Sequence, residues 1–112
     1  MINIDEKLNI SELLNIYGAV LTKHQAEMMR LYFDCDISLF EIASEFGISR
    51  QAVRDALLRG EKTLRETDAK LNIRSKLAEV KRDINQLIDY IQTGEAEKVL
   101  EQAEKTLAAL EE

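Results

Sequence analysis

The sequence contains no proline, four glycines and one cysteine, and only 5% of its 112 residues are aromatic. An all-β sandwich or barrel needs many more turn-forming residues, so this composition predicts an all-α protein. A chain of this length builds one compact domain, and we expect a single all-helical domain over residues 1–112. The hydrophobic content of 46% is enough to fill its core, with aliphatic side chains doing most of the packing.

Residues that carry chemistry are equally scarce. Cys35 has no second cysteine with which to form a disulfide, and His24 is the only histidine, so the two cannot complete a zinc site. The sequence has no glycine-rich phosphate loop and no defensible set of nucleophile, base and orienting residue. We therefore expect no enzyme activity, no cofactor and no metal.

Long apolar runs and an excess of positive charge are also missing. No apolar stretch approaches the length of about 18 residues that a membrane span needs, and residues 1–7 do not look like a signal peptide. We expect no membrane span and a location in the reducing cytoplasm. The 15 basic residues are outnumbered by 21 acidic ones, and the net charge of −6 argues against a protein whose whole surface binds nucleic acid.

Apolar residues recur at helical spacing from about Asp5 to Leu21, which predicts a first helix. The apolar stripe of this helix consists of Leu8, Leu13, Leu14, Ile16, Tyr17, Val20 and Leu21. Thr22 precedes Gln25 by three residues, which is the spacing of a capping box, so a second helix is expected to begin there. Its apolar face is Met28, Met29, Leu31, Tyr32 and Phe33, and Asp34-Cys35-Asp36 ends it.

The segment that follows has the pattern of a helix-turn-helix. Ser38 and Glu41 form a second capping-box pattern before a short helix that runs to about Phe46. Gly47 can adopt the left-handed backbone that stops this helix, and Ser49 is a candidate cap for the next one. Two helices joined by the three-residue turn Gly47-Ile48-Ser49 are typical of a helix-turn-helix.

The apolar positions of this segment predict which side chains face the solvent. We expect Ile42, Ile48 and Val53 to share a core, which Leu39 and Leu57 extend, with small Ala43 allowing a close approach of the two helices. Arg50, Gln51 and Arg54, with Asp55 beside them, then project from the first turns of the second helix. Arginine can bond bidentately to guanine and glutamine to adenine in the major groove. The candidate DNA-binding residues are therefore Ser49, Arg50, Gln51 and Arg54, with Arg59 and Lys62 at phosphates.

Charge is distributed unevenly along the chain. Residues 38–72 hold six basic and six acidic groups, whereas residues 1–37 and 73–112 each sum to −3. A DNA-binding surface gains most of its affinity from neutralising phosphates, so the basic footprint expected here is narrow. An ordinary solvated surface on a helix pair that only packs is the alternative interpretation of these charges.

A different pattern begins beyond Leu71. Ile73, Leu77, Val80, Ile84, Leu87 and Ile91 are spaced 4, 3, 4, 3 and 4 residues apart, which is close to a heptad repeat. We expect a joint near Asn72, a break at Gly94 and a last amphipathic helix carrying Ala96, Val99, Ala103, Leu107 and Leu110. The bundle of residues 5–72 is thus followed by an amphipathic tail, 73–112. This tail either pairs within the chain as a hairpin or forms a homodimer, or its acidic outer face meets a basic partner.

The run LTKHQAEMMRLYFDCDISLFEIASEFGISRQAVRDALLRGEKTL resembles the fourth region of bacterial sigma factors, which reads the upstream promoter element. The closer resemblance is to the YlxM family of small proteins similar to that region. It is carried by LLNIYG, by DISLFEIA and by the turn SRQAV, over about residues 11–71. The resemblance implies an all-α protein of the bacterial cytoplasm, encoded beside the GTPase of the signal recognition particle, and a role in regulating that particle's pathway.

Two functions remain open at this stage. In the first, the protein is a DNA-binding regulator whose recognition helix begins at Ser49, where the resemblance also places it. In the second, it is an accessory factor that binds the GTPase or the RNA of the signal recognition particle directly and uses the helix-turn-helix as a docking surface.

Overall fold

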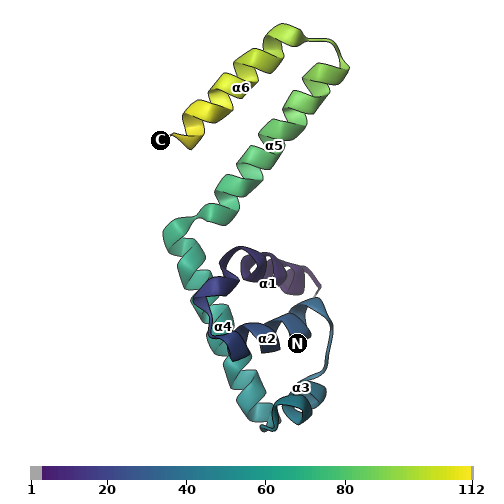
Figure 1. Ribbon diagram of the computed structural model, residues 1–112, viewed down its shortest axis with the longest axis vertical. Helices are drawn as coiled ribbons and strands as arrows, with labels where there is room; N and C mark the ends of the chain where they lie inside the picture. The colour runs from purple at the N-terminus through teal and green to yellow at the C-terminus, as the bar shows by residue number, and fades with distance from the viewer. Residues whose placement is uncertain (1–3, 112) are drawn as a thin grey trace. The chain divides into compact units, whose positions relative to one another are not determined.

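The computed structural model describes residues 4–111, and within this range it contains six α-helices and no β-strand. The predicted all-α fold is confirmed. The helices are α1 (Ile4–Tyr17), α2 (Lys23–Met29), α3 (Leu39–Phe46), α4 (Arg50–Leu71), α5 (Ile73–Gln92) and α6 (Ala96–Leu110) (Figure 1). Contacts between residues divide the chain after Asn72 into two compact units, here called the N-terminal unit and the C-terminal unit.

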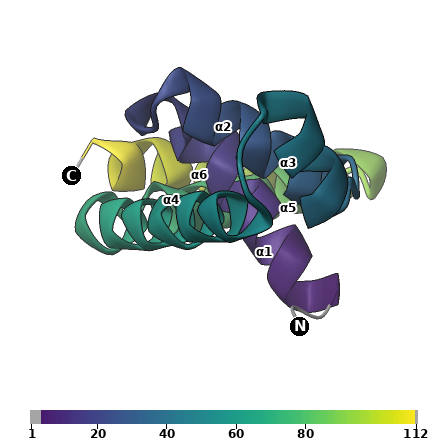
Figure 2. The same ribbon diagram turned by 90° about the horizontal axis from the view of Figure 1, so that it is seen from below.

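The N-terminal unit is built around α4, against which α1, α2 and α3 all pack. Figure 2 shows α2 and α3 together on one side of α4. Every buried hydrophobic residue in the described part of the chain belongs to this unit. The core consists of Ile10, Leu13, Leu14, Tyr17, Leu21, Ala26, Met28, Met29, Phe33, Ile42, Ala43, Val53, Ala56, Leu57 and Leu64.

Two residues of the predicted first stripe do not enter this core. Leu8 and Val20 are exposed, so their predicted place in the apolar stripe is wrong. Successive residues of a helix are turned by about 100°, which puts Leu8 on the face of α1 opposite Ile10 and Tyr17. Val20 lies beyond α1, in the short 3₁₀ turn Gly18–Val20.

Of the two reciprocal hydrogen bonds of the capping box predicted for α2, only the one accepted by the Thr22 side chain is present in the described part of the chain. Thr22 Oγ1 accepts a hydrogen bond from the backbone N–H of Gln25 at 3.2 Å. A capping box would add a hydrogen bond from the Thr22 N–H to the Gln25 side-chain oxygen, and the described residues show none; Gln25 Nε2 donates to the carbonyl of Ala56 in α4 at 3.4 Å. The residue predicted to cap its own helix therefore ties α2 to α4.

The end of α2 changes from α-helical to π-helical geometry. The helix continues directly into a π-helical turn, Arg30–Asp34, which ends at Cys35, and Asp36 then adopts a left-handed backbone with φ 59°. The predicted end at Asp34-Cys35-Asp36 is confirmed.

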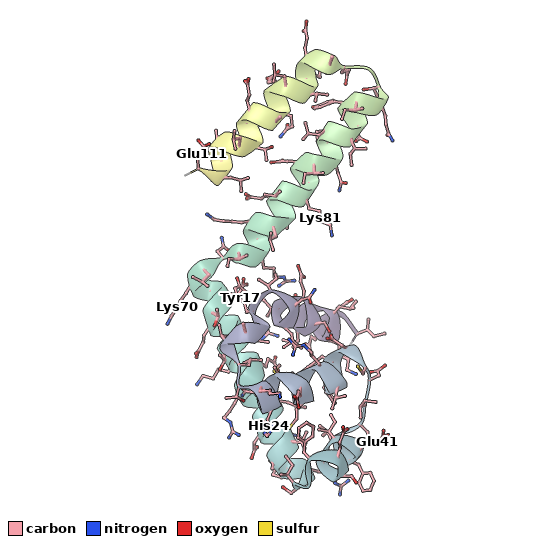
Figure 3. All side chains as sticks on the ribbon, viewed as in Figure 1. Tyr17, His24, Glu41, Lys70, Lys81 and Glu111 are labelled. Atoms are coloured by element: carbon pink, nitrogen blue, oxygen red, sulfur yellow. The ribbon has the colours of Figure 1, made fainter. Side chains whose placement is uncertain are left out.

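A hydrogen bond between distant residues fixes α1 against the far end of α4. The Tyr17 hydroxyl donates to Asp68 Oδ1 at 2.6 Å, in a partly buried position, and the tyrosine ring itself is buried. Tyr17 lies at the end of α1 that meets α4 (Figure 3). This bond spans 51 residues of sequence and belongs wholly to the N-terminal unit.

The C-terminal unit consists of α5 and α6, which lie side by side and run in opposite directions (Figure 1). The joint predicted near Asn72 is confirmed, since Asn72 ends α4 in a left-handed conformation with φ 53°. The break predicted at Gly94 is also confirmed, because Gly94 has φ 76° in the turn between α5 and α6.

Candidate nucleic-acid interface

Local hydrogen bonds and one glycine form the turn between α3 and α4. Ser38 caps α3 by accepting from Glu41 N–H at 3.1 Å, and Ser49 caps α4 by accepting from Ala52 N–H at 3.0 Å. Gly47 ends α3 with φ 67°, a conformation that a β-carbon would strain. The serine caps and the glycine stop predicted for this helix-turn-helix are confirmed, whereas the return bond of the predicted Ser38–Glu41 capping box, from Ser38 N–H to the Glu41 side chain, is absent among the described residues.

The buried face of α4 determines which of its side chains are available. Val53, Ala56, Leu57, Gly60 and Leu64 are buried and lie on one side of the helix. Their packing against the rest of the core fixes the rotation of α4, because turning the helix would expose this whole face.

Ile42 and Ala43 of α3 are buried as predicted, but Ile48 is not. Ile48 has 40% of its surface exposed, so its predicted place in the shared core is wrong. Its backbone N–H bonds the carbonyl of Ala43 at 3.1 Å, in the turn that Gly47 creates. The left-handed glycine ends α3, and in the turn that follows the Ile48 side chain lies partly in solvent.

Three of the predicted site residues lie together on the open side of α4. Arg50, Gln51 and Arg54 are exposed and, with Leu39 of α3, line a hollow of about 460 Å³. Neither arginine forms an ion pair with any residue that the structure describes. Their guanidinium groups are thus available to an anionic or hydrogen-bonding ligand. Ser49, at the start of the helix, uses its oxygen as the cap acceptor and keeps its hydroxyl hydrogen free to donate.

Gln51 is already engaged by a neighbour. Its Nε2 donates to Asp55 Oδ1 at 3.0 Å, one turn further along α4. The spacing of four residues is a known signal for such Gln–Asp pairs on a helix, and it could have been read from the sequence. Bidentate contact with a base requires Gln51 to exchange this partner, at a cost of about 0.2–0.5 kcal/mol.

The two predicted phosphate contacts are separated from this group. At about 100° per residue, Arg59 is turned by about 180° from Arg50 around the axis of α4. Lys62 shares the flank of Gln51 three turns further along, and its ammonium lies 4.0 Å from Glu66 Oε1. Four of the six predicted residues therefore form one cluster: Ser49, Arg50, Gln51 and Arg54. The other two, Arg59 and Lys62, lie outside it.

An apolar hollow beside the arginines has no counterpart in the sequence-based prediction. It encloses about 540 Å³, and Arg54 and Leu39 border both hollows. Its apolar lining is Tyr32, Phe33, Leu39, Leu57 and Leu58, with Glu6 and Glu61 as acidic neighbours. Leu58 is 57% exposed and Phe40, nearby in sequence on α3, is 66% exposed. Both are out of phase with the buried positions of their helices, and this is the signal that could have revealed them.

The remaining chemical candidates lie apart from this surface. His24 is exposed and its ring packs edge-on against Phe46, with the ring centroids 6.0 Å apart. Cys35 is exposed. Residues 4–111 contain no group of three side chains positioned to hold a metal ion. Within the same range, no helix has the length and apolar character needed to cross a membrane.

Comparison with known proteins shows the family to which the sequence belongs. The model of the family UPF0122, described as "Putative helix-turn-helix protein, YlxM / p13 like", matches residues 4–110. The chain belongs to the UPF0122 family. The resemblance to the YlxM family is thereby confirmed, and the chain is a helix-turn-helix protein.

Relatives of similar length occur in several bacteria. A UPF0122 protein of Desulforamulus reducens is 36% identical over 104 residues, which cover 90% of this chain and 87% of the relative. One of Clostridium acetobutylicum is 34% identical over 111 residues, covering 93% and 96% respectively. One of Lactiplantibacillus plantarum is 39% identical over 88 residues, covering 79% and 76%. Membership supports a DNA-binding regulator as the general class of this UPF0122 protein.

Proposed function

We propose that this UPF0122 protein is a DNA-binding regulator whose α4 enters the major groove with its first turns. Arg50, Gln51 and Arg54 contact base edges in this arrangement, and the Ser49 hydroxyl donates to a phosphate. Arg59 and Lys62 are three residues apart on α4 and lie about 60° from each other around its axis, so both contact phosphates of the same DNA backbone.

One observation carries this proposal. The side chains of Arg50, Gln51 and Arg54 gather at one hollow on the open side of the recognition helix, and both arginines are free of ion pairs among the described residues. Arginine and glutamine are the side chains that pair bidentately with guanine and adenine. A helix pair that merely packs has no need to keep the two arginines together and free of ion pairs.

The small number of cations on this surface predicts that the affinity for DNA falls only weakly as the salt concentration rises. Each neutralised phosphate contributes a slope of about −0.9 to the plot of log Kobs against log salt, so two outlying cations give a slope of about −2. Binding is then carried mainly by base contacts, and the affinity for non-specific DNA is low.

The test begins with double-stranded oligonucleotides selected from a random pool by the purified protein. Fluorescence anisotropy on the selected site should show that Arg54→Ala and Arg50→Ala each weaken the specific complex by about 1–3 kcal/mol and relax the preference at one base position. Lys70→Ala is the matched control, because it removes one exposed positive charge from the far end of α4 (Figure 3). Asp55→Ala should strengthen binding, since it releases Gln51 and removes a negative charge. Equal weak binding to every DNA, unchanged by Arg54→Ala, contradicts the proposal.

A second candidate function is supported by the apolar hollow beside Arg54. In this alternative the protein is an accessory factor of the signal recognition particle and docks on its GTPase or RNA. Exposed Leu58 and an apolar lining favour a protein partner, because contiguous exposed apolar surface marks interaction sites. A pull-down and a GTPase assay with the purified particle test this function, with Leu58→Glu as the disrupting variant. No binding and no change of rate at micromolar protein counts decisively against it.

A further inference from the structure

The C-terminal unit is a helical hairpin without a core of its own. None of its described residues is buried, although both helices are strongly amphipathic. Where α5 and α6 touch, side chains such as Val80, Leu87 and Val99 are only half-buried. The Thr106 hydroxyl donates to Asp83 Oδ2 at 3.0 Å across this contact. A segment of about 40 residues is too small to bury a stable core alone.

The hairpin has an open apolar stripe on each helix. On α5 the stripe consists of Leu77, Ile84, Ile88 and Ile91, which are 46–65% exposed. At about 100° per residue these four side chains lie within about 60° of one another around the helix axis. On α6 the stripe consists of Leu100 and Leu107, which are 63% and 57% exposed.

The two stripes lie on the same side of the hairpin. On each helix the stripe lies about a quarter turn around the axis from the face that contacts the other helix. On both helices this rotation has the direction in which the chain winds from lower to higher residue numbers. Antiparallel helices wind in opposite senses when viewed from one end, so these displacements bring both stripes to one side. We call this surface, formed by the six residues of the two stripes, the open face.

The open face is large for so small a unit. Six aliphatic side chains that are each about half exposed leave on the order of 500 Å² of apolar surface, which is near the upper limit for the largest patch on a typical monomer. A stable protein–protein interface buries about 800 Å² per partner. The open face alone supplies more than half of that area.

The edges of the open face carry opposite charges. On the α5 edge, helical phase places the basic residues Arg74 and Lys81 and one acidic residue, Asp89, and Figure 3 shows Lys81 on the side of α5 away from α6. On the α6 edge, helical phase places four acidic residues and no basic one: Glu97, Glu101, Glu104 and Glu111. Such a surface complements itself when it is rotated so that the α5 edge of one copy meets the α6 edge of another.

We propose that the open face binds a second copy of this chain. The two hairpins stack face to face, with α5 of each copy against α6 of the other, and form an antiparallel four-helix bundle whose two-fold axis is parallel to the helices. A two-fold axis across the helices would instead set the four acidic residues of one copy against those of the other. Since α5 follows directly on α4 in the chain, both helix-turn-helix units are joined to the same end of this bundle.

The molar mass of the full-length protein tests this assembly without DNA, so the result is independent of the proposed DNA binding. Light scattering at micromolar concentrations should give twice the chain mass of 12.8 kDa. Ile84→Lys and Leu107→Lys should each give the monomer mass, because an unpaired ammonium would be buried in the bundle. Ser75→Lys is the matched control, since Ser75 is exposed on the opposite side of α5 and its substitution should leave the dimer intact. Circular dichroism confirms that each variant is folded.

A charge exchange tests the pairing of the helices. In the proposed bundle Lys81 lies level with the acidic edge of the second copy, between Glu104 and Glu111. Lys81→Glu should raise the dissociation constant of the dimer several-fold, and Glu104→Lys in the same chain should restore it. A monomeric wild-type protein, or a dimer that survives both Ile84→Lys and Leu107→Lys, overturns the proposal. Failure of Glu104→Lys to restore the dimer overturns the pairing of α5 with α6.

Discussion

Gly60 provides the most direct test of how the N-terminal unit is packed. It is buried in the middle of α4, where α2 crosses the helix. A β-carbon at this position would lie 2.2 Å from Met29 Sδ, 3.3 Å from Met29 Cε and 3.4 Å from Gln25 Cγ. Met29 has no exposed surface, so its side chain cannot move into solvent to make room.

Two opposing effects set the size of the change in Gly60→Ala. Alanine is more favourable than glycine within a helix by about 1 kcal/mol. Overpacking a filled core costs about 1–3 kcal/mol, and a shift of Gln25 also threatens its bond to the Ala56 carbonyl, worth about 0.5–1.5 kcal/mol. We therefore expect a net loss of about 1–2 kcal/mol in the free energy of unfolding, measured by urea denaturation followed by circular dichroism.

Two further variants separate packing from helix propensity. Ala69→Gly, at an exposed position of the same helix, should lose about 1 kcal/mol through propensity alone. In a Met29→Ala background the obstructing sulfur is absent, so Gly60→Ala should become neutral or stabilising by about 1 kcal/mol. A Gly60→Ala protein that equals or exceeds the wild type in stability, with Met29 intact, refutes the argument.

Three other predictions concern single side chains. Tyr17→Phe removes the 2.6 Å bond to Asp68 and should lower the free energy of unfolding by about 1 kcal/mol in urea denaturation, whereas an unchanged midpoint would show that the bond adds nothing. Ser49→Ala removes the cap of the recognition helix and should cost about 1 kcal/mol in the same assay, with faster hydrogen exchange at the first amides of α4; unaltered exchange there argues against it. Lys98 lowers the pKa of Glu95 chiefly by donating a hydrogen bond to its carboxylate, so any stability from this pair is present at neutral pH and is lost as the pH falls through that pKa. In Lys98→Ala the Glu95 titration followed by NMR should move to higher pH, and an unmoved midpoint excludes the interaction.

Features that depend on neighbouring residues were predictable from the sequence. Thr22, Ser38 and Ser49 cap their helices through N–H groups three residues away, and Gly47 and Asn72 end helices through their own backbone conformations. Each is a local interaction, so the residues that decide it are adjacent in the chain.

Features that depend on distant residues were not predictable in the same way. Gln25 has the spacing of a capping-box residue but bonds Ala56, which is 31 residues away. Ile48 is apolar and lies between two helices of the core, yet the turn leaves it exposed. In the candidate site, residue types and helical phase identified Arg50 and Arg54, whereas the apolar hollow beside Arg54 forms only when α1, the π-helical turn Arg30–Asp34, α3 and α4 come together.

The sequence by itself determined an all-α chain, the position of its helix-turn-helix and the break between bundle and tail, because periodicity and caps act over a few residues. It also indicated that Arg50, Gln51 and Arg54 project from the first turns of α4 when Val53 and Leu57 face inward, since helical phase relates residues on one helix. Only the tertiary structure decided that Gly60 must remain without a side chain and that Arg54 borders an apolar hollow. It also decided that no residue of the described range 4–111 covers the six apolar residues of the open face. Burial is a property of what packs against a residue, and those partners are far away in the sequence.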